Sequence, residues 1–216
     1  MELFHGSEII SEKPLFGSGN PFNDYGLGFY CTREINLARE WACTEGKDGF
    51  VNKYDFNLDG LRVLYLNSGK YNILHWLSIL LQNRRFDLST PVSVQARQYL
   101  LDHFLPDYRR YDVIIGYRAD DSYFSFARAF LANGITLEQL SRAMTLGKLG
   151  EQIVIVSEAA FSRLHFIASE PVDANVFFPR RMFRDRQARN DYLSILAEAP
   201  EENPIYVTDI IHGKSI

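Results

Sequence analysis

Hydrophobic and polar positions along the chain follow two periods, and the switches between them outline the predicted elements. Apolar residues alternate with polar ones, or form short β-branched runs, in segments typical of strands. These are residues 1–6, 28–32, 51–56, 62–66, 111–116 and 151–156, with a last strand beginning within 161–168. Apolar residues recur at helical spacing in 33–44, 73–83, 92–104, 122–133 and 136–144. Residues 7–23 are rich in Gly, Pro, Ser and Asn, which predicts a long loop.

The order of these elements favours an α+β domain with a mostly antiparallel, split β core and flanking helices. Residues 58–61 form a turn signal, so we expect the strands 51–56 and 62–66 on either side of it to be antiparallel neighbours. No glycine-rich phosphate loop opens a helix, which disfavours a parallel Rossmann sheet. We predict one domain over residues 1–170 and a C-terminal extension, 171–216, that packs on it or tails from it.

Composition supports a single well-packed domain. The 216 residues are 46% apolar and 14% aromatic, enough for a substantial core. A net charge of −4 gives no overall sign of nucleic-acid or anionic-membrane binding. No apolar stretch is long enough to span a bilayer and no leader pattern is visible, so we expect a cytoplasmic protein.

Cysteine and histidine spacing does not indicate a metal site. Cys31 and Cys43 are separated by a predicted helix, and we expect both to be buried free thiols. The only concentrated basic run is residues 180–189, which carries five arginines around Phe183. It could contact nucleic-acid phosphates or an acidic partner, but we favour a solvated surface helix paired with nearby acids.

Two N-terminal segments together suggest half of a nicotinamide-dinucleotide pocket. The first is Leu3-Phe4-His5-Gly6-Ser7, in which the imidazole of His5 can bind a ribose hydroxyl and Gly6 exposes its backbone to a flat carboxamide. The second is the turn Tyr25-Gly26-Leu27-Gly28-Phe29-Tyr30, whose aromatic side chains offer faces for stacking. Each segment alone is more often structural.

Four motifs then follow in an order and approximate spacing that resemble the diphtheria-toxin-like and poly-ADP-ribose-polymerase-like ADP-ribosyltransferases. They are the two segments above, Ala38-Arg39-Glu40-Trp41 and Gly150-Glu151-Gln152-Ile153-Val154. Together with Asp112-Val113-Ile114-Ile115-Gly116 and Asp120-Asp121, they more closely resemble a bacterial domain of unknown function, numbered 3990, that is grouped with these transferases and often found beside small antitoxin-like genes. The resemblance covers residues 1–170.

The resemblance implies NAD as substrate and assigns roles to particular residues. His5 would hold the adenosine-side ribose and Gly6 would meet the nicotinamide amide, while Tyr30 and Trp41, beside Tyr25 of the glycine turn, would line the nicotinamide pocket. A cationic nicotinamide is attracted to an aromatic face, and tryptophan is the best such face. Asp120 and Asp121 could cap the following helix or face the acceptor, and helix capping is the default expectation.

A carboxylate that accepts a hydrogen bond from the ribose 2′-hydroxyl stabilises the oxocarbenium character that develops as nicotinamide leaves, and it orients the sugar. Glu151, at the start of its strand, resembles that residue. Because neighbours on a strand point to opposite faces, Gln152 could face the pocket instead. A glutamine there could position NAD but would supply less electrostatic stabilisation.

The resulting prediction is an ADP-ribosyltransferase that passes ADP-ribose to a macromolecular acceptor, protein, RNA or DNA, and acts as a bacterial toxin or defence effector. The acceptor would approach beside residues 20–24 or 147–150, and an antitoxin protein could restrain the enzyme. Two alternatives stay open: an NAD glycohydrolase that uses water as acceptor, and a catalytically inactive module that binds NAD or a partner.

Overall fold

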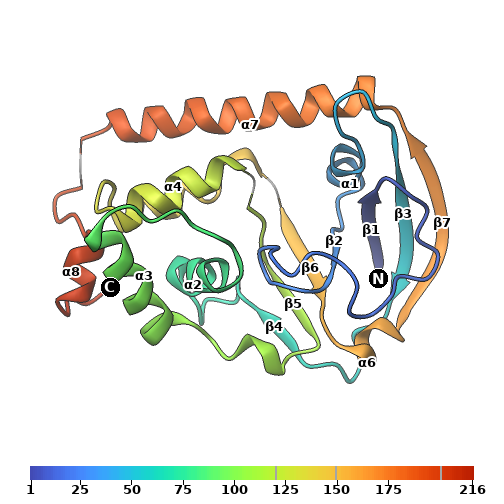
Figure 1. The fold of residues 1–216 in the computed structure, drawn as a ribbon, viewed down its shortest axis with the longest axis horizontal. Helices are drawn as coiled ribbons and strands as arrows, with labels where there is room; N and C mark the ends of the chain where they lie inside the picture. The colour runs from blue at the N-terminus through green and yellow to red at the C-terminus, as the bar shows by residue number, and fades with distance from the viewer. Residues whose placement is uncertain (120, 149, 200) are drawn as a thin grey trace.

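The computed structural model describes residues 1–119, 121–148, 150–199 and 201–216, and it places two small sheets beside a layer of helices (Figure 1). A three-stranded sheet has the order β1-β3-β7, and a four-stranded sheet has the order β2-β6-β5-β4. The strands are β1 (Glu2–Ser7), β2 (Phe29–Cys31), β3 (Gly49–Phe56), β4 (Val63–Tyr65), β5 (Val113–Tyr117), β6 (Glu151–Ile155) and β7 (Leu164–Val172). The longer helices are α1 (Ile35–Ala42), α2 (Ile73–Asn83), α3 (Pro91–Phe104), α4 (Asp121–Leu131), α5 (Leu137–Ala143) and α7 (Ala174–Ala197). Shorter turns of helix are α6 (Glu158–Phe161), α8 (Val207–Ile211), η1 (Tyr108–Arg110) and η2 (Leu146–Lys148).

The predicted α+β class is confirmed, with antiparallel and mixed sheets and flanking helices. One pairing was wrong: β3 and β4 are not neighbours. Both edges of β3 are taken by antiparallel partners, β1 and β7, whereas β4 lies parallel to β5 in the other sheet. A short turn between two strands is a local signal for antiparallel pairing. Here it is outweighed because β3 pairs along its length with the longer strands β1 and β7.

The two sheets separate between β1 and β2. Among the described residues, the pair Phe4 and Thr32 bridges them: the backbone N–H of Phe4 donates to the carbonyl of Thr32 at 2.8 Å, and the N–H of Thr32 donates to the carbonyl of Phe4 at 2.9 Å. Beyond this bridge the strands diverge, and α1 packs against β1 and β3. The split β core therefore leaves a gap that side chains from both sheets can line.

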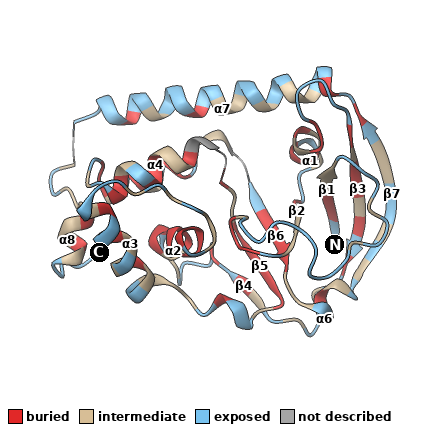
Figure 2. Cartoon of the chain, viewed as in Figure 1, coloured by how far each residue is buried: buried red, intermediate tan, exposed pale blue. Residues whose placement is uncertain are grey.

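The helices build the largest core. Buried apolar residues of α2 and α4 pack around Trp76, Phe126 and Phe130, each at most 1% exposed (Figure 2). Asn72, which precedes α2, and Thr136, which precedes α5, cap their helices with reciprocal side-chain and backbone hydrogen bonds. These helices share one core with Leu64, Ile114 and Val154, so they cover one face of the four-stranded sheet.

The helix α7 crosses the top of the molecule in Figure 1 and contacts α1, α4 and α5. Arg184 forms an ion pair with Glu40 of α1, and Arg189 pairs with Asp185 at 2.8 Å. The basic run is thus helical with acidic partners, as favoured above, although Arg181 is half-buried rather than solvated. Residue 170, the predicted domain boundary, lies within β7, which is hydrogen-bonded to β3.

Both cysteines are buried free thiols, as predicted, and burial raises the pKa of the Cys31 thiol. Among the helices in the described ranges, none is both long enough and apolar enough to cross a membrane.

Candidate functional site

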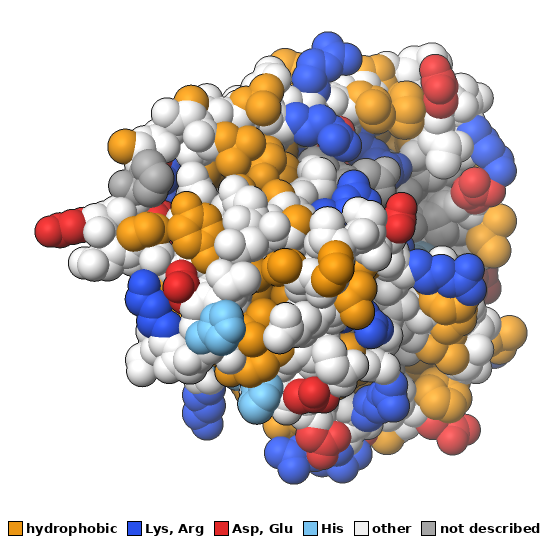
Figure 3. Space-filling view, turned by 60° about the vertical axis from the view of Figure 1, so that its left-hand side comes forward, with side chains coloured by type: hydrophobic (Ala, Val, Ile, Leu, Met, Phe, Trp, Pro, Cys, Tyr) orange, Lys and Arg blue, Asp and Glu red, His pale blue; other side chains and the backbone are white. Residues whose placement is uncertain are grey.

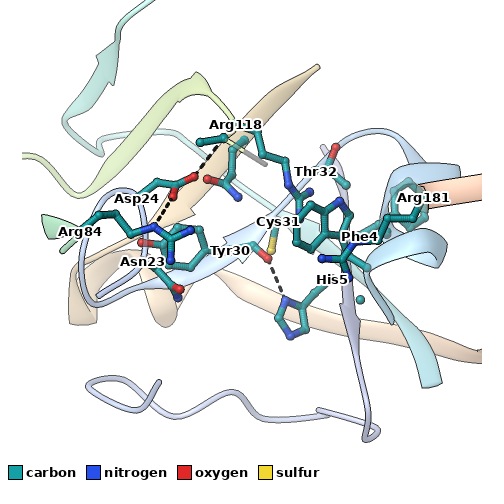
Figure 4. A pocket seen from close by; sticks show the side chains of 15 residues that line it. Phe4, His5, Asn23, Asp24, Tyr30, Cys31, Thr32, Arg84, Arg118 and Arg181 are labelled. Carbon is teal, nitrogen blue, oxygen red and sulfur yellow. Dashed lines mark hydrogen bonds and ion pairs between the residues drawn. The ribbon is translucent and has the colours of Figure 1, made fainter. Parts of the chain in front are cut away.

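A cavity of about 240 Å³ opens where the two sheets separate. Its walls come from β1, β2, α1 and β6, with further side chains from the loop before β2, the segment after β5 and the helix α7. Figure 4 shows these side chains converging from elements far apart in the sequence. Of the predicted site residues, the structure places five in this lining: His5, Gly6, Tyr30, Trp41 and Gln152.

His5 is held as a neutral imidazole with one nitrogen available. Its Nδ1 lies 2.8 Å from the carbonyl oxygen of Tyr30, and since a carbonyl only accepts, Nδ1 carries the hydrogen and donates. Burial lowers the pKa of His5, and the nearby charge of Arg118 lowers it further, against the opposing effect of the hydrogen bond to Tyr30. In this tautomer Nε2 is an acceptor, which suits a ligand hydroxyl.

The packing of α1 requires a glycine at position 6, independently of any ligand. A Cβ at this position would lie 2.1 Å from the carbonyl oxygen of Ala38 and 2.7 Å from the backbone nitrogen of Ala42. The helix α1 therefore packs directly on the backbone of β1, which brings Trp41 to the cavity. Because no side chain can be accommodated at this position, Gly6 contributes only backbone to the cavity wall.

The two tyrosines of the glycine turn have different environments. Tyr25 is 2% exposed and donates from its hydroxyl to the carbonyl of Tyr117 at 2.6 Å, so it anchors the loop to β5 and does not line the cavity. Tyr30 does line it, and its hydroxyl donates to the carbonyl of Gly26 at 2.5 Å. The ring of Tyr25 belongs to the helical core, so the structure does not bring it into the cavity lining with His5 and Tyr30.

Strand β6 presents Gln152, not Glu151, to the cavity. Gln152 is buried opposite Gly116, whereas Glu151 is exposed and accepts a hydrogen bond from Nδ2 of Asn67 at 3.0 Å. Alternation along the strand separates the two side chains, and of the two candidates the structure brings Gln152 into the cavity lining. The buried Oε1 of Gln152 has no hydrogen-bond partner within the described ranges.

Trp41 lies beneath two guanidinium groups that the sequence reasoning missed. The Cζ atom of Arg118 is 3.5 Å from the centroid of the Trp41 ring, and that of Arg181 is 4.2 Å from it. Arg118 follows β5, and Arg181 belongs to α7. The basic run that contains Arg181 was visible in the sequence, but nothing local placed it beside Trp41.

Asp24 and Arg84 complete the lining at the other end of the cavity. Asp24 is 6% exposed, pairs with Nε of Arg84 at 3.1 Å, and accepts a hydrogen bond from the backbone N–H of Ala119 at 3.1 Å. The described lining residues carry three guanidinium groups against one carboxylate, so the cavity favours an anionic ligand. Within the described part of the chain, no cluster of His, Cys, Asp and Glu is placed to hold a metal ion.

The motif resemblance also included the acidic pair Asp120-Asp121. Asp120 lies outside the described residues, and Asp121 is the first residue of α4.

Comparison with known proteins identifies a family. The model of the family described as "Protein of unknown function (DUF3990)" matches residues 1–166, a range that includes β1, β2, α1 and β6 but ends before α7. No curated protein and no solved structure matches the chain. Since the match covers well over half of the sequence, the chain belongs to the DUF3990 family.

Proposed function

We propose that this protein is an ADP-ribosyltransferase that cleaves NAD and transfers ADP-ribose to a macromolecular acceptor. One observation carries the proposal: His5, Tyr30 and Gln152, from three strands far apart in the sequence, line a single cavity beside the backbone of Gly6. This is the order of motifs that suggested the transferases, with Gln152 in place of Glu151 at the last position.

The lining residues suit the adenosine-side ribose and the nicotinamide ring of NAD. Nε2 of His5 can accept a hydrogen bond from a ribose hydroxyl because Nδ1 is already committed to Tyr30. Tyr30 contributes an aromatic side chain to the cavity lining, and an aromatic face would attract the cationic nicotinamide. Trp41 is less suited to that role, since Arg118 and Arg181 lie over its ring.

The reaction breaks the bond between ribose C1′ and the nicotinamide nitrogen, and the electron pair leaves with nicotinamide, which becomes neutral. A nucleophilic atom of the acceptor bonds to C1′, and its proton passes to solvent. Oε1 of Gln152 would accept a hydrogen bond from the ribose 2′-hydroxyl. This contact would orient the sugar and leave the negative end of the hydroxyl dipole toward the developing oxocarbenium ion. A neutral amide stabilises this charge less than a carboxylate does, so we expect slow turnover.

A specific observation favours the main alternative, an inactive dinucleotide-binding module. Glu151 is exposed and bonded to Asn67, so the acid expected at the ribose is not in the cavity lining. Hydrolysis is the second alternative, in which water replaces the acceptor at C1′.

The same resemblance supports a cytoplasmic bacterial toxin or defence effector that an antitoxin protein restrains. Expression of the chain in a bacterial host should then slow growth, and Gln152→Ala should relieve the effect at equal protein level. Growth inhibition that persists in Gln152→Ala would count against NAD chemistry as its cause.

Incubation of the purified protein with labelled NAD and a fractionated lysate tests the activity. Free nicotinamide together with label in a protein or nucleic-acid fraction, both lost in Gln152→Ala, would support transfer and identify the acceptor class. Nicotinamide without labelled macromolecule would show hydrolysis. NAD that binds but stays intact would show the inactive module.

A further inference from the structure

Two arginines from distant segments meet over one tryptophan at the end of the cavity away from Asp24. Arg118 and Arg181 both place their Cζ atoms within 4.2 Å of the Trp41 ring centroid. All three residues line the cavity, and Figure 4 shows the two arginines extending into it from different elements. The indole keeps the two planar cations together at one wall.

The helix α7 is held in register for this contact. Arg184 pairs with Glu40, which is adjacent to Trp41 on α1, and both side chains of the pair are largely buried. Since Arg181 lies three residues before Arg184, it projects from the same side of α7 and reaches Trp41. Figure 3 shows Lys and Arg side chains gathered along the upper part of the surface, where α7 runs, but only Arg181 of this helix reaches the cavity lining that the structure describes.

Charge decides which part of a dinucleotide suits this end. A cationic nicotinamide ring placed against Trp41 would lie within a few ångströms of two other cations, which is unfavourable in a partly desolvated site. A diphosphate carries two negative charges, and guanidinium groups bind phosphate oxygens through paired N–H donors. Asp24, the acidic residue of the described lining, is already paired with Arg84.

We propose that Arg118, Trp41 and Arg181 form a diphosphate clamp, and that α7 thereby supplies a ligand-binding residue from outside the segment matched by the family model. The clamp rests on the proposed function for its ligand, the diphosphate of NAD. The clamp gives Trp41 a different role from the one that the motif resemblance implies. The indole holds the two arginines at the diphosphate, and the nicotinamide ring lies toward Tyr30. Arg181 is a binding residue for the dinucleotide and takes no part in bond cleavage.

Calorimetric titration of the full chain tests the clamp without requiring turnover. The probes are inorganic pyrophosphate, NAD and nicotinamide riboside, which carries the nicotinamide and its ribose but no phosphate. The variant is Arg181→Gln, and Arg180→Gln is the matched control because Arg180 is exposed on the same helix, lies over Phe177 and loses the same charge. Arg181→Lys tests whether a charge without the planar fork is sufficient.

Arg181→Gln should weaken pyrophosphate and NAD binding about tenfold or more, the usual effect of losing a charge-assisted hydrogen bond, and leave the riboside affinity unchanged. Arg181→Lys should bind with intermediate affinity, and Arg180→Gln should match the wild type. Absence of pyrophosphate binding to the wild type, equal weakening by both glutamine variants, or an equal loss of riboside affinity would overturn the clamp.

A single-stranded oligonucleotide provides the competing arm. Binding of the oligonucleotide that depends on Arg181 and that pyrophosphate does not displace would assign these arginines to a nucleic acid and overturn the clamp. Failure of the clamp is distinguishable from failure of the proposed function. Pyrophosphate binding without NAD cleavage supports the clamp alone, whereas NAD cleavage with an unaffected Arg181→Gln supports the enzyme alone.

Discussion

The two tryptophans of the chain occupy contrasting regions. Trp76, in the helical core, is 1% exposed, donates from Nε1 to the carbonyl of Tyr117 at 3.1 Å and packs against the Tyr117 ring. Trp41, at the cavity, is half-buried, and its Nε1 has no hydrogen-bond partner in the described ranges. Buried polar atoms are nearly always paired in folded proteins, so the core is complete by itself. At the cavity, by contrast, Trp41 Nε1 and Gln152 Oε1 both lack a partner among the described residues, and the proposed function uses Gln152 Oε1 to bind a ligand.

The largest effect on stability should come from the helical core. Phe130 is fully buried there, so Phe130→Ala should lower the free energy of unfolding by about 3–5 kcal/mol. Denaturant titration measures the loss, and NAD affinity measured under conditions where the variant is folded should stay at the wild-type level. A selective loss of NAD affinity in a folded Phe130→Ala would break the separation between core and cavity.

Two buried amides sharpen the comparison. Asn52 is fully buried and satisfied: Oδ1 accepts from the N–H of Ser11 at 2.9 Å, and Nδ2 donates to Oγ of Ser7 at 3.0 Å. Asn52→Leu should therefore cost about 1–3 kcal/mol because it leaves those partners unpaired. Gln152→Leu removes an unpartnered acceptor and should leave the unfolding free energy within about 1 kcal/mol of wild type while NAD binding falls. Equal destabilisation by both changes would show that Gln152 is a structural residue.

Gly6 lies where fold and cavity meet. An added methyl would collide with the backbone of α1 at Ala38, so Gly6→Ala should lower the unfolding free energy by about 1–3 kcal/mol and displace Trp41. Thermal and denaturant unfolding measure the change. Wild-type stability combined with lost NAD affinity would mean that the ligand alone requires a glycine here.

The smallest effect is a pH dependence from His5. Burial lowers the pKa of folded His5 below its ordinary 6.5, so the unfolded chain binds the proton more readily. The contribution of His5 to stability is complete above pH 6.5 and is lost as the pH falls through the lower pKa of the folded state.

Unfolding free energies measured from roughly pH 5 to 8 should thus fall less steeply on acidification in His5→Gln than in the wild type. His75, whose pKa is also lowered by burial, is present in both proteins and cancels in the difference. Identical slopes would contradict the neutral, buried imidazole.

Local patterns predicted the elements well. The helix 73–83 has the predicted bounds, because its apolar spacing and the capping Asn72 are both encoded within a few residues. The partner of β4 was not predictable, since it depends on which sheet edges the rest of the chain leaves open. Short-range signals thus gave the elements and their class, while long-range competition decided the sheet order.

The site was predicted in part for the same reason. His5, Gly6, Tyr30 and Trp41 lie in local motifs, and the structure brings them together. The face of β6 depends on how the strand pairs with β5, which one-residue alternation leaves ambiguous. Arg181 comes from a helix that starts after the last sheet strand, and only the docking of α7 on α1 places it in the cavity.

The most direct test compares two neighbouring side chains on β6. Nicotinamide release at saturating NAD should fall on the order of 100-fold in Gln152→Ala, because the contact to the ribose is strongest in the transition state. Glu151→Ala should stay close to the wild-type rate, since that side chain is exposed and bonded to Asn67. Loss of turnover in Glu151→Ala with an active Gln152→Ala would contradict the account, because the acid would then reach the ribose despite facing away from the cavity.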